Sequence, residues 1–300
     1  MFVSDQVALY RWPVAVIGAG PVGLAAAARV LERGLPVRVF EAGEVAAHVR
    51  DWGHVRLFSP WRYNIDDAAR SLLLRNGWAE PDGDALPTGA ELRDRYLLPL
   101  AQTPELAGVI EPGTRVERIS RRGADKVLSR DRASRPFVLH VRSGSGLRRE
   151  FASAVIDASG TWSNQNPLGG DGLPALGERE SGEMIHTGIP DVLGRDRDAF
   201  LGAATLVVGA GHSAANVLLD LVRLAAETRR TDVTWAVRGT DLTRAFGGGA
   251  DDALAARGDL GSRLRAAVDD GRVRLVKGFS VVEVTRIGDR LTVIADDGRA

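Results

Sequence analysis

Short apolar runs along the chain alternate with glycine-rich loops and with segments that carry an apolar stripe at helical spacing. Residues 13–17 form a β-branched apolar run of the kind that becomes a strand buried on both faces of a parallel sheet. A glycine-rich loop, residues 18–23, follows at once, and residues 24–31 place their apolar side chains on one face of a helix. The pattern predicts a strand, a tight loop and a helix in direct succession.

The same order of elements recurs in the second half of the chain. Residues 205–208 predict a strand and residues 209–214 a loop. The helix predicted next has one long apolar stripe, formed by Ala214, Val217, Leu218, Leu221 and Leu224. Each half then continues into a second strand-like run, residues 36–40 in the first half and 233–237 in the second. We therefore predict two units of the same construction in one chain.

The first loop has the spacing Gly-x-Gly-x-x-Gly, in which each glycine has a separate physical function. Gly18 permits a tight turn, Gly20 lets the backbone approach a pyrophosphate, and Gly23 lets the helix pack against the strand. Phosphates then lie at the N-terminus of the helix, where backbone N–H groups and the helix dipole favour an anion. The second loop repeats this pattern with an alanine in the third position, so both loops predict dinucleotide binding.

The residue that ends the second strand differs in charge between the two units. Glu41 lies about 20 residues beyond the first loop, where a carboxylate accepts hydrogen bonds from both hydroxyls of an adenosine ribose. Arg238 takes the corresponding place in the second unit, and its planar charged fork suits a ribose 2′-phosphate, which a glutamate would repel. A solvated surface role is the alternative for this arginine. We predict that the units hold different dinucleotides, the second being NADPH rather than NADH.

Composition and charge narrow the classes of partner and chemistry. The 300 residues suffice for one or two domains. The 39 basic residues balance the 39 acidic ones without strong segregation along the sequence. We therefore expect that neither nucleic acid nor a membrane surface is a partner. Residues 12–28 are uncharged but contain two prolines and three glycines, which argues against a signal or membrane segment and for a cytoplasmic protein. The absence of cysteine excludes a disulfide, a thiolate metal site and a dithiol redox centre. No pair of the five histidines has metal-ligand spacing with a third donor nearby, so no metal site is expected.

Three segments together resemble the two-dinucleotide-binding-domain flavoproteins, in the branch of the flavin-containing monooxygenases and the thioredoxin-reductase-like enzymes. They are the first loop through Leu24, the run from Ala154 to Gly160 with Ser159 where that family has threonine, and the second loop through Asn216. The resemblance implies an α/β fold of two Rossmann-like three-layer dinucleotide-binding domains with parallel sheets and β-meanders, with FAD in the first and NADPH in the second. The implied FAD contacts are Gly18, Gly20, Pro21, Val22, Gly23, Glu41, Arg50, Trp61, Val116, Ser159 and Gly160. The implied NADPH contacts are Gly209, Gly211, His212, Ser213, Ala214 and Arg238.

About 70 residues separate Glu41 from the next strand, which is too long for a plain crossover and predicts a largely helical insert over residues 42–112. In the family the corresponding stretch passes the flavin ring, which implies contacts from Arg50 and Trp61. Packing is the alternative for a tryptophan in such an insert. Residues 89–100 predict a helix that serves the core.

The resemblance implies an NADPH-dependent FAD oxidoreductase, most similar to a monooxygenase, that passes hydride from nicotinamide to flavin and then to oxygen or a small acceptor. Gly182 and His186 fit only part of the monooxygenase fingerprint, because Glu180 and Pro190 stand where aromatic residues belong. A flavin-dependent quinone or small-molecule reductase and a noncatalytic nucleotide-binding fragment remain open, and no catalytic residue is singled out. The partners expected are a small-molecule substrate or oxygen, with the oligomeric state open and a homodimer included.

We expect an FAD-binding domain over residues 1–165 and an NAD(P)H-binding domain over residues 166–300. By the spacing of the first half, the second domain is incomplete, with a closing strand expected about 10 to 15 residues beyond Ala300. The family also returns to finish its FAD domain after the NADPH unit. The sequence is therefore expected to be a shortened version of a longer protein.

Overall fold

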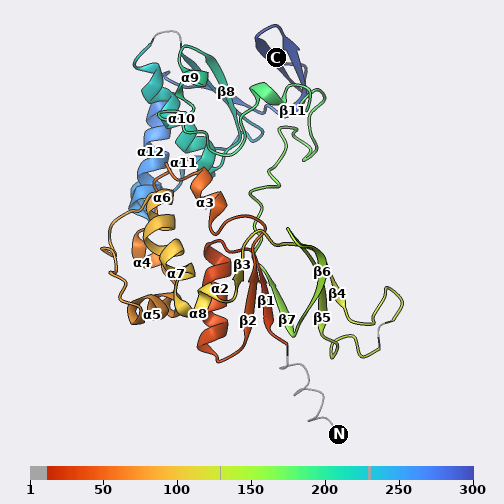
Figure 1. Cartoon of the computed structure of the whole chain (residues 1–300). Coiled ribbons are helices and arrows are strands. Elements are labelled where there is room, and N and C mark those ends of the chain that lie inside the picture. The colour runs from red at the N-terminus through yellow and green to blue at the C-terminus, as the bar shows by residue number, and fades with distance from the viewer. Residues whose placement is uncertain (1–11, 129, 229–230) are drawn as a thin grey trace. The chain divides into compact units, whose positions relative to one another are not determined.

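The computed structural model describes residues 12–128, 130–228 and 231–300 (Figure 1). The chain divides into two compact units, unit 1 over Met1–Thr161 and unit 2 over Trp162–Ala300.

Unit 1 combines a parallel sheet, a helix, a helical insert and a β-meander. Its first elements are β1 (Val14–Ile17), α2 (Pro21–Glu32) and β2 (Val37–Phe40). The insert contains α3 (Ala47–Asp51), α4 (Trp61–Asn64), α5 (Asp67–Arg75), α6 (Gly89–Leu92), η1 (Arg93–Leu97), α7 (Leu98–Ala101) and α8 (Pro104–Ala107). The remaining strands are β3 (Ile110–Glu111), β4 (Arg115–Arg121), β5 (Phe137–Ser143), β6 (Gly146–Ala152) and β7 (Ala154–Asp157).

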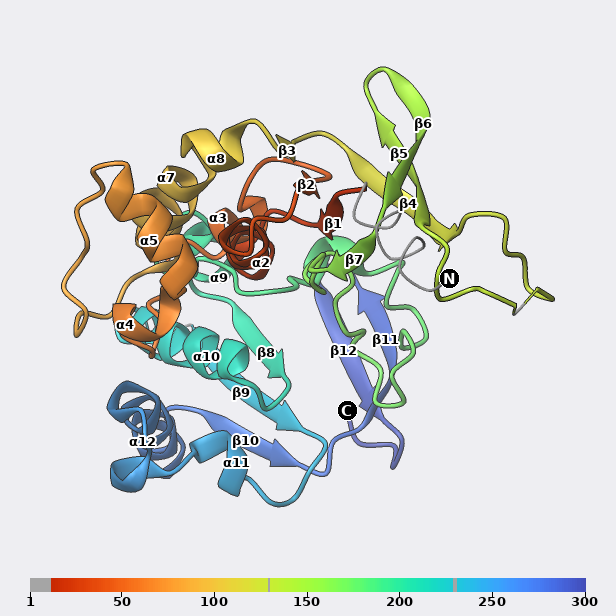
Figure 2. The ribbon, with the colours of Figure 1, turned by 90° about the horizontal axis from the view of Figure 1, so that it is seen from below.

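The parallel sheet of unit 1 has the strand order β3-β2-β1-β7 and is covered on both faces. Along β1, Val14 and Val16 pack into the helical core, while Ala15 belongs to a second apolar cluster with Leu139 and Val141 of β5. This alternation explains the continuous apolar run in the sequence, because successive side chains of a strand point to opposite faces. Figure 2 shows α2 almost end-on, with the sheet between it and the meander of β4, β5 and β6.

A π-helical turn, η1, interrupts the helical segment predicted over residues 89–100. Pro99 has no backbone N–H, so the carbonyl four residues earlier, at Arg95, cannot receive its usual helical bond. The indole Nε1 of Trp78 donates to that carbonyl at 2.7 Å. Proline therefore accounts for the irregular turn, and a tryptophan satisfies the carbonyl it leaves free. Tyr96, Leu97 and Leu100 are buried, as expected of a core segment.

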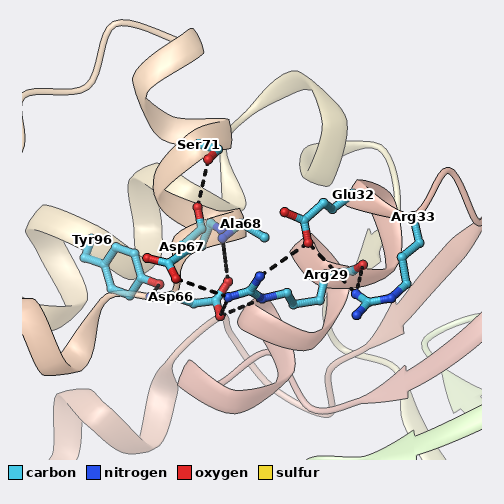
Figure 3. Close-up of polar contacts among 9 residues, drawn as sticks. Arg29, Glu32, Arg33, Asp66, Asp67, Ala68, Ser71 and Tyr96 are labelled. Atoms are coloured by element: carbon cyan, nitrogen blue, oxygen red, sulfur yellow. Dashed lines mark hydrogen bonds and ion pairs between the residues drawn. The ribbon is translucent and has the colours of Figure 1, made fainter.

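The insert is joined to α2 through the first turn of α5 (Figure 3). Asp66 caps this helix, its carboxylate accepting from the N–H groups of Ala68 at 2.9 Å and Ala69 at 3.2 Å. The same carboxylate accepts from the guanidinium of Arg29 on α2 at 2.9 Å. The hydroxyl of Tyr96 accepts from the backbone N–H of Asp66 at 3.1 Å, and burial raises the pKa of this phenol to about 12.

Unit 2 repeats the layered construction. Its elements are η2 (Gly182–Met184), α9 (Arg197–Phe200), β8 (Ala204–Val208), α10 (His212–Ala225), β9 (Asp232–Val237), α11 (Thr243–Phe246), η3 (Gly249–Asp251), α12 (Ala255–Asp269), β10 (Arg274–Lys277), β11 (Val281–Ile287) and β12 (Arg290–Ala295). The parallel sheet has the order β10-β9-β8, and β11 and β12 form an antiparallel hairpin. Trp235 and Val237 face the core with α10 and α12, whereas Ala236 faces the core with the hairpin. Figure 2 shows this parallel sheet between the two helices and the hairpin.

The predicted α/β fold of two Rossmann-like three-layer units, with parallel sheets and meander-type antiparallel layers, is confirmed. Within the described ranges, the antiparallel layer has three strands in unit 1 and two in unit 2. None of the helices in these ranges is both long enough and apolar enough to cross a bilayer.

Candidate functional site: two dinucleotide loops

The structure brings three sequence-predicted segments of unit 1 to one edge of its parallel sheet. Ile17 of β1 is in register with Phe40 of β2 and with Asp157 of β7. The loops that follow these three strands therefore meet at the carboxyl edge, where ligands bind in open α/β sheets. The first loop, the turn after β2 and the segment after β7 all lie there.

The glycines of the first loop, residues 18–23, have the packing that their spacing predicts. Gly18 has a φ of +96°, and a Cβ placed on it would lie 2.6 Å from the carbonyl oxygen of Ala158. A Cβ on Gly23 would lie 1.9 Å from the carbonyl oxygen of Gly18, so the helix can pack this closely only without a side chain. A Cβ on Gly20 would meet nothing within 4 Å. Gly18 and Gly23 thus serve the protein's own packing, whereas Gly20 borders open space that suits a diphosphate.

The first turn of α2 adds an electrostatic preference for an anion. Gly20 is the N-cap and has no side chain to bond the free N–H groups, Pro21 occupies the first turn, and no acidic residue follows there. The positive end of the helix dipole is therefore not neutralised by the helix itself. Val22, on this turn, is 69 % exposed. This end of α2 is suited to bind phosphate.

Glu41 lies beside the loop at the end of β2. Its carboxylate accepts from the backbone N–H of Ala19 at 2.7 Å and from that of Gly43 at 2.8 Å. These bonds hold the carboxylate next to the glycine loop, where an adenosine ribose would lie if a diphosphate occupied the loop. The carbonyl of Glu41 also accepts from the N–H of Thr114 at 2.7 Å, which brings the start of β4 to the same edge.

The segment after β7 closes the first site on its other side. Ser159 is exposed, and its hydroxyl and N–H both donate to Asp157, at 2.7 and 3.1 Å. These two bonds lower the pKa of the Asp157 carboxyl, the hydroxyl bond contributing more. Gly160 follows with a φ of +68°, a conformation that favours glycine. Sequence reasoning did not single out Asp157 or Ala158, although both belong to the motif on which Ser159 was identified.

The three remaining residues expected at this site have different positions. Arg50 is exposed on α3 and forms an ion pair with Glu44 at 2.7 Å. Val116 is the second residue of β4, at the Glu41 edge, and is partly buried between the meander and the parallel sheet. Trp61 is only 1 % exposed and packs in the helical core. The expected flavin contact of Trp61 needs a surface that this ring does not offer, so its burial favours the packing alternative.

The second loop, residues 209–214, has the same construction at the carboxyl edge of unit 2. Gly209 has a φ of +124°, and its carbonyl accepts from the indole Nε1 of buried Trp235 at 2.6 Å. A Cβ on Gly209 or Gly211 would meet nothing within 4 Å. Gly211 is the N-cap of α10, with neither a side-chain cap nor an acidic residue in the first turn. Ala214 occupies the position of Gly23, so this helix leaves room for a Cβ that the first unit does not.

Polar side chains border the second loop. His212 and Ser213 are exposed in the first turn of α10, and the amide of Asn216 donates to the carbonyl of His212 at 2.9 Å. Arg238 is exposed directly after β9, and its guanidinium donates to the carbonyl of Gly170.

Lys277 is a cation at this edge that sequence reasoning missed. It ends β10 and is in register with Val237, the residue before Arg238. The sequence signal is a strand that ends in lysine, but only the strand pairing shows that this lysine lies beside Val237, the residue before Arg238. One cation therefore ends β10 and another follows the neighbouring β9 at the carboxyl edge of unit 2.

Over the described ranges, no three or more His, Asp or Glu side chains are grouped to hold a metal ion. His186 of the partial monooxygenase fingerprint stacks on Phe200 with ring centroids 4.8 Å apart. The two glycine loops are thus the sites with the clearest chemical character.

Comparison with solved structures identifies the fold. Bacillithiol disulfide reductase from Bacillus cereus matches with a TM-score of 0.66 and 18% identity, over 95% of this chain and 75% of its own. Ornithine N-hydroxylase from Kutzneria sp. 744 matches with a TM-score of 0.57 and 18% identity, over 95% and 76%. A flavin-containing monooxygenase from Stenotrophomonas maltophilia matches with a TM-score of 0.58 and 21% identity, over 96% and 74%. The chain has the fold of the two-dinucleotide-binding-domain oxidoreductases, as its motifs predict.

No protein-family model matches the sequence, and no curated protein sequence is significantly similar to it.

Proposed function

We propose that this protein is an NADPH-dependent FAD oxidoreductase that binds FAD in unit 1 and NADPH in unit 2. The observation that supports this assignment is the pair of open glycine loops, one beside Glu41 and the other beside Arg238. The ornithine N-hydroxylase with the same fold was solved with reduced FAD and NADP+. Opposite charges at the two ribose positions give the two units different cofactor preferences.

In unit 1, the residues of the first loop bind and orient the dinucleotide. The N-terminus of α2 stabilises the diphosphate, and Gly20 lets the backbone approach it closely. Glu41 accepts hydrogen bonds from the ribose hydroxyls through the lone pairs that its two bonds to backbone N–H groups leave available. Once bound, FAD supplies the redox chemistry, taking hydride from the nicotinamide and returning electrons to oxygen or a small acceptor.

In unit 2, the corresponding residues bind the diffusible donor. The N-terminus of α10 and the glycines of the second loop receive the diphosphate. Arg238, with Lys277 on the neighbouring strand, neutralises a 2′-phosphate at the carboxyl edge. Because the sequence contains no cysteine, electrons cannot leave through a dithiol. We therefore propose a monooxygenase-like reaction as the main candidate and a small-molecule reductase as the second candidate.

Reduction of bound flavin by NADPH tests this function directly. Protein purified or reconstituted with FAD is expected to be yellow and to bleach when NADPH is added without oxygen. Oxygen is then readmitted. Oxygen uptake in proportion to the NADPH oxidised, with formation of an oxygenated product in addition to peroxide, supports a monooxygenase. Electron transfer to a quinone without oxygen uptake supports a reductase. Protein that binds NADPH but never retains FAD would contradict the proposal and favour a noncatalytic nucleotide-binding role.

Arg238→Ala is expected to reduce the preference for NADPH. The loss of one charge-assisted contact to the 2′-phosphate should raise KM for NADPH by about tenfold, roughly 1.4 kcal/mol, while leaving KM for NADH unchanged. The measurement is steady-state reduction of an artificial acceptor with each nucleotide. The matched control is Arg244→Ala, because Arg244 is an exposed arginine on α11, which follows β9 in the chain. Equal losses with both nucleotides would show that Arg238 does not recognise the 2′-phosphate.

A further inference from the structure

The two faces of the β-meander in unit 1 differ in how far acidic side chains balance their arginines. On the face toward the parallel sheet, Arg148 forms ion pairs with Glu111 and Glu150, and Arg38 of β2 binds the same two glutamates. The four side chains alternate in charge and connect β2, β3 and β6. Arg38 and Arg148 on this inner face are thus neutralised by the protein itself, whereas Arg121 lies over the ring of Phe137.

The outer face is strongly basic. Cross-strand pairing places Arg115 opposite Arg142, and it aligns Arg118, His140 and Arg149 in one row across the three strands. Arg122 extends the same face, since its guanidinium and that of Arg149 both lie 5.4 Å from the ring centroid of Phe151. We call Arg115, Arg118, Arg122, Arg142 and Arg149 the arginine face. All five residues are exposed.

The arginine face is almost without counter-charge. Arg142 pairs with Glu117, whose pKa is lowered first by Arg142 and then by Arg118 and Arg115. Among the described residues, the other four arginines of the face have no carboxylate within ion-pairing distance. Asp5 is the one acidic residue at the positions outside the described ranges, so it can balance at most one of them.

The charge balance of the whole chain hides this segregation. Residues 115–149 contain eleven Arg and Lys against three Asp and Glu, in a sequence with 39 of each sign. The expectation that charge is evenly spread is therefore wrong for this segment. Like charges placed directly opposite, as at Arg115 and Arg142, destabilise a sheet, so this arrangement does not serve folding.

We propose that the arginine face docks an acidic protein surface, with rows of Asp and Glu meeting rows of Arg. Arginine forks bind carboxylates in a planar, bidentate way, and neighbouring strands about 4.8 Å apart present them at regular spacing. Single-stranded nucleic acid is disfavoured because its bases stack on free aromatic rings. The two rings here, Trp12 and Phe151, pack on each other with centroids 5.0 Å apart, and two arginines lie against Phe151.

Fluorescence anisotropy with two labelled probes of equal charge, an oligoglutamate peptide and an oligothymidylate, tests this proposal on the full chain. The peptide is expected to bind more tightly than the DNA, and its binding should disappear at about 1 M salt, where the Debye length is ~3 Å. Arg118→Glu with Arg149→Glu should weaken peptide binding by about tenfold or more. The control pair Arg244→Glu with Arg290→Glu, exposed arginines of unit 2, changes net charge equally and should have little effect.

Each contrary result overturns the proposal. DNA bound as tightly as the peptide or more so would indicate general or nucleic-acid binding, and equal weakening by both variant pairs would remove the arginine face as the site. Binding only to vesicles of anionic phospholipid, or dimerisation that depends on Arg118 and Arg149, would identify a different occupant. Should the charge-reversed pair fail to fold, Arg118→Gln with Arg149→Gln should still weaken peptide binding, and unchanged binding would contradict the proposal. None of these outcomes bears on flavin reduction by NADPH.

Discussion

Gly20→Ala is expected to abolish tight FAD binding while leaving the fold of unit 1 intact. An added Cβ meets no protein atom within 4 Å, and the backbone at Gly20 is in an extended conformation that alanine also adopts. The methyl group would instead occupy the space through which a diphosphate approaches the loop. We expect the affinity for FAD to fall by about 100-fold, roughly 2.7 kcal/mol. Titration of the apoprotein with FAD measures the affinity, and thermal unfolding measures the stability.

Gly23→Ala is the structural counterpart of this variant, because its Cβ would lie 1.9 Å from the carbonyl oxygen of Gly18. Loop or helix must move, so unit 1 should lose about 1–3 kcal/mol of stability together with its flavin. Gly108→Ala is the control for both, since its Cβ is also free of contacts and it precedes β3, at the amino edge of the sheet. If Gly20→Ala bound FAD as tightly as the unaltered protein, the first loop would not be the diphosphate site.

The local geometry of the first loop follows from spacing within a few residues. The turn at Gly18, the close helix contact at Gly23 and the open space beside Gly20 are present in the structure, and dinucleotide binding there stays a prediction. Glu41 could be placed because a strand of known length begins soon after the helix, which brings its last residue to the loop. Local spacing therefore carries most of the information about the two loops.

The parts that sequence reasoning missed depend on strand pairing or on single irregular positions. Lys277 becomes a neighbour of Arg238 only through the register of β9 and β10. On strict alternation, Arg115 and Arg118 would lie on opposite faces of β4. A bulge at Glu117 shifts the register between Val116 and Arg118 and places both arginines on the outer face. A one-residue shift of this kind has no reliable signal in an isolated sequence.

The insert shows a third limit of prediction from sequence. Its residue types indicate that it contains helices and core residues, but a residue's place in the sequence does not show which neighbours it contacts. Trp61 was a candidate for either the flavin or the core, and burial by surrounding helices favours the core. The helix over residues 89–100 was correctly placed as a core segment, yet its π-turn follows from a proline inside the helical pattern. Which carbonyl the proline frees is clear from the sequence, whereas the tryptophan that bonds it comes from a distant segment.

Asp66→Ala is expected to destabilise the insert without weakening FAD binding. The carboxylate both caps α5 and holds the Arg29 guanidinium of α2 (Figure 3). The Asp66 side chain is 23% exposed. Loss of an N-cap alone lowers the free energy of unfolding by about 1 kcal/mol, and the charge-assisted bond to arginine brings the expected total to about 2 kcal/mol. Arg29 lies eight residues beyond Pro21, about 12 Å along α2, so the diphosphate end should keep its geometry.

Two neighbouring variants separate the contributions of Asp66. Asp66→Asn retains a capping oxygen but loses the charge that pairs with Arg29, so it should recover roughly the 1 kcal/mol that belongs to the cap. Asp67→Ala is the matched control, because Asp67 is 88% exposed and lies 3.7 Å from Arg29, beyond hydrogen-bonding distance. Chemical denaturation gives the free energy of unfolding, and FAD titration gives the affinity. A weaker affinity for FAD in Asp66→Ala at unchanged stability would mean that this contact positions the glycine loop rather than anchoring the insert.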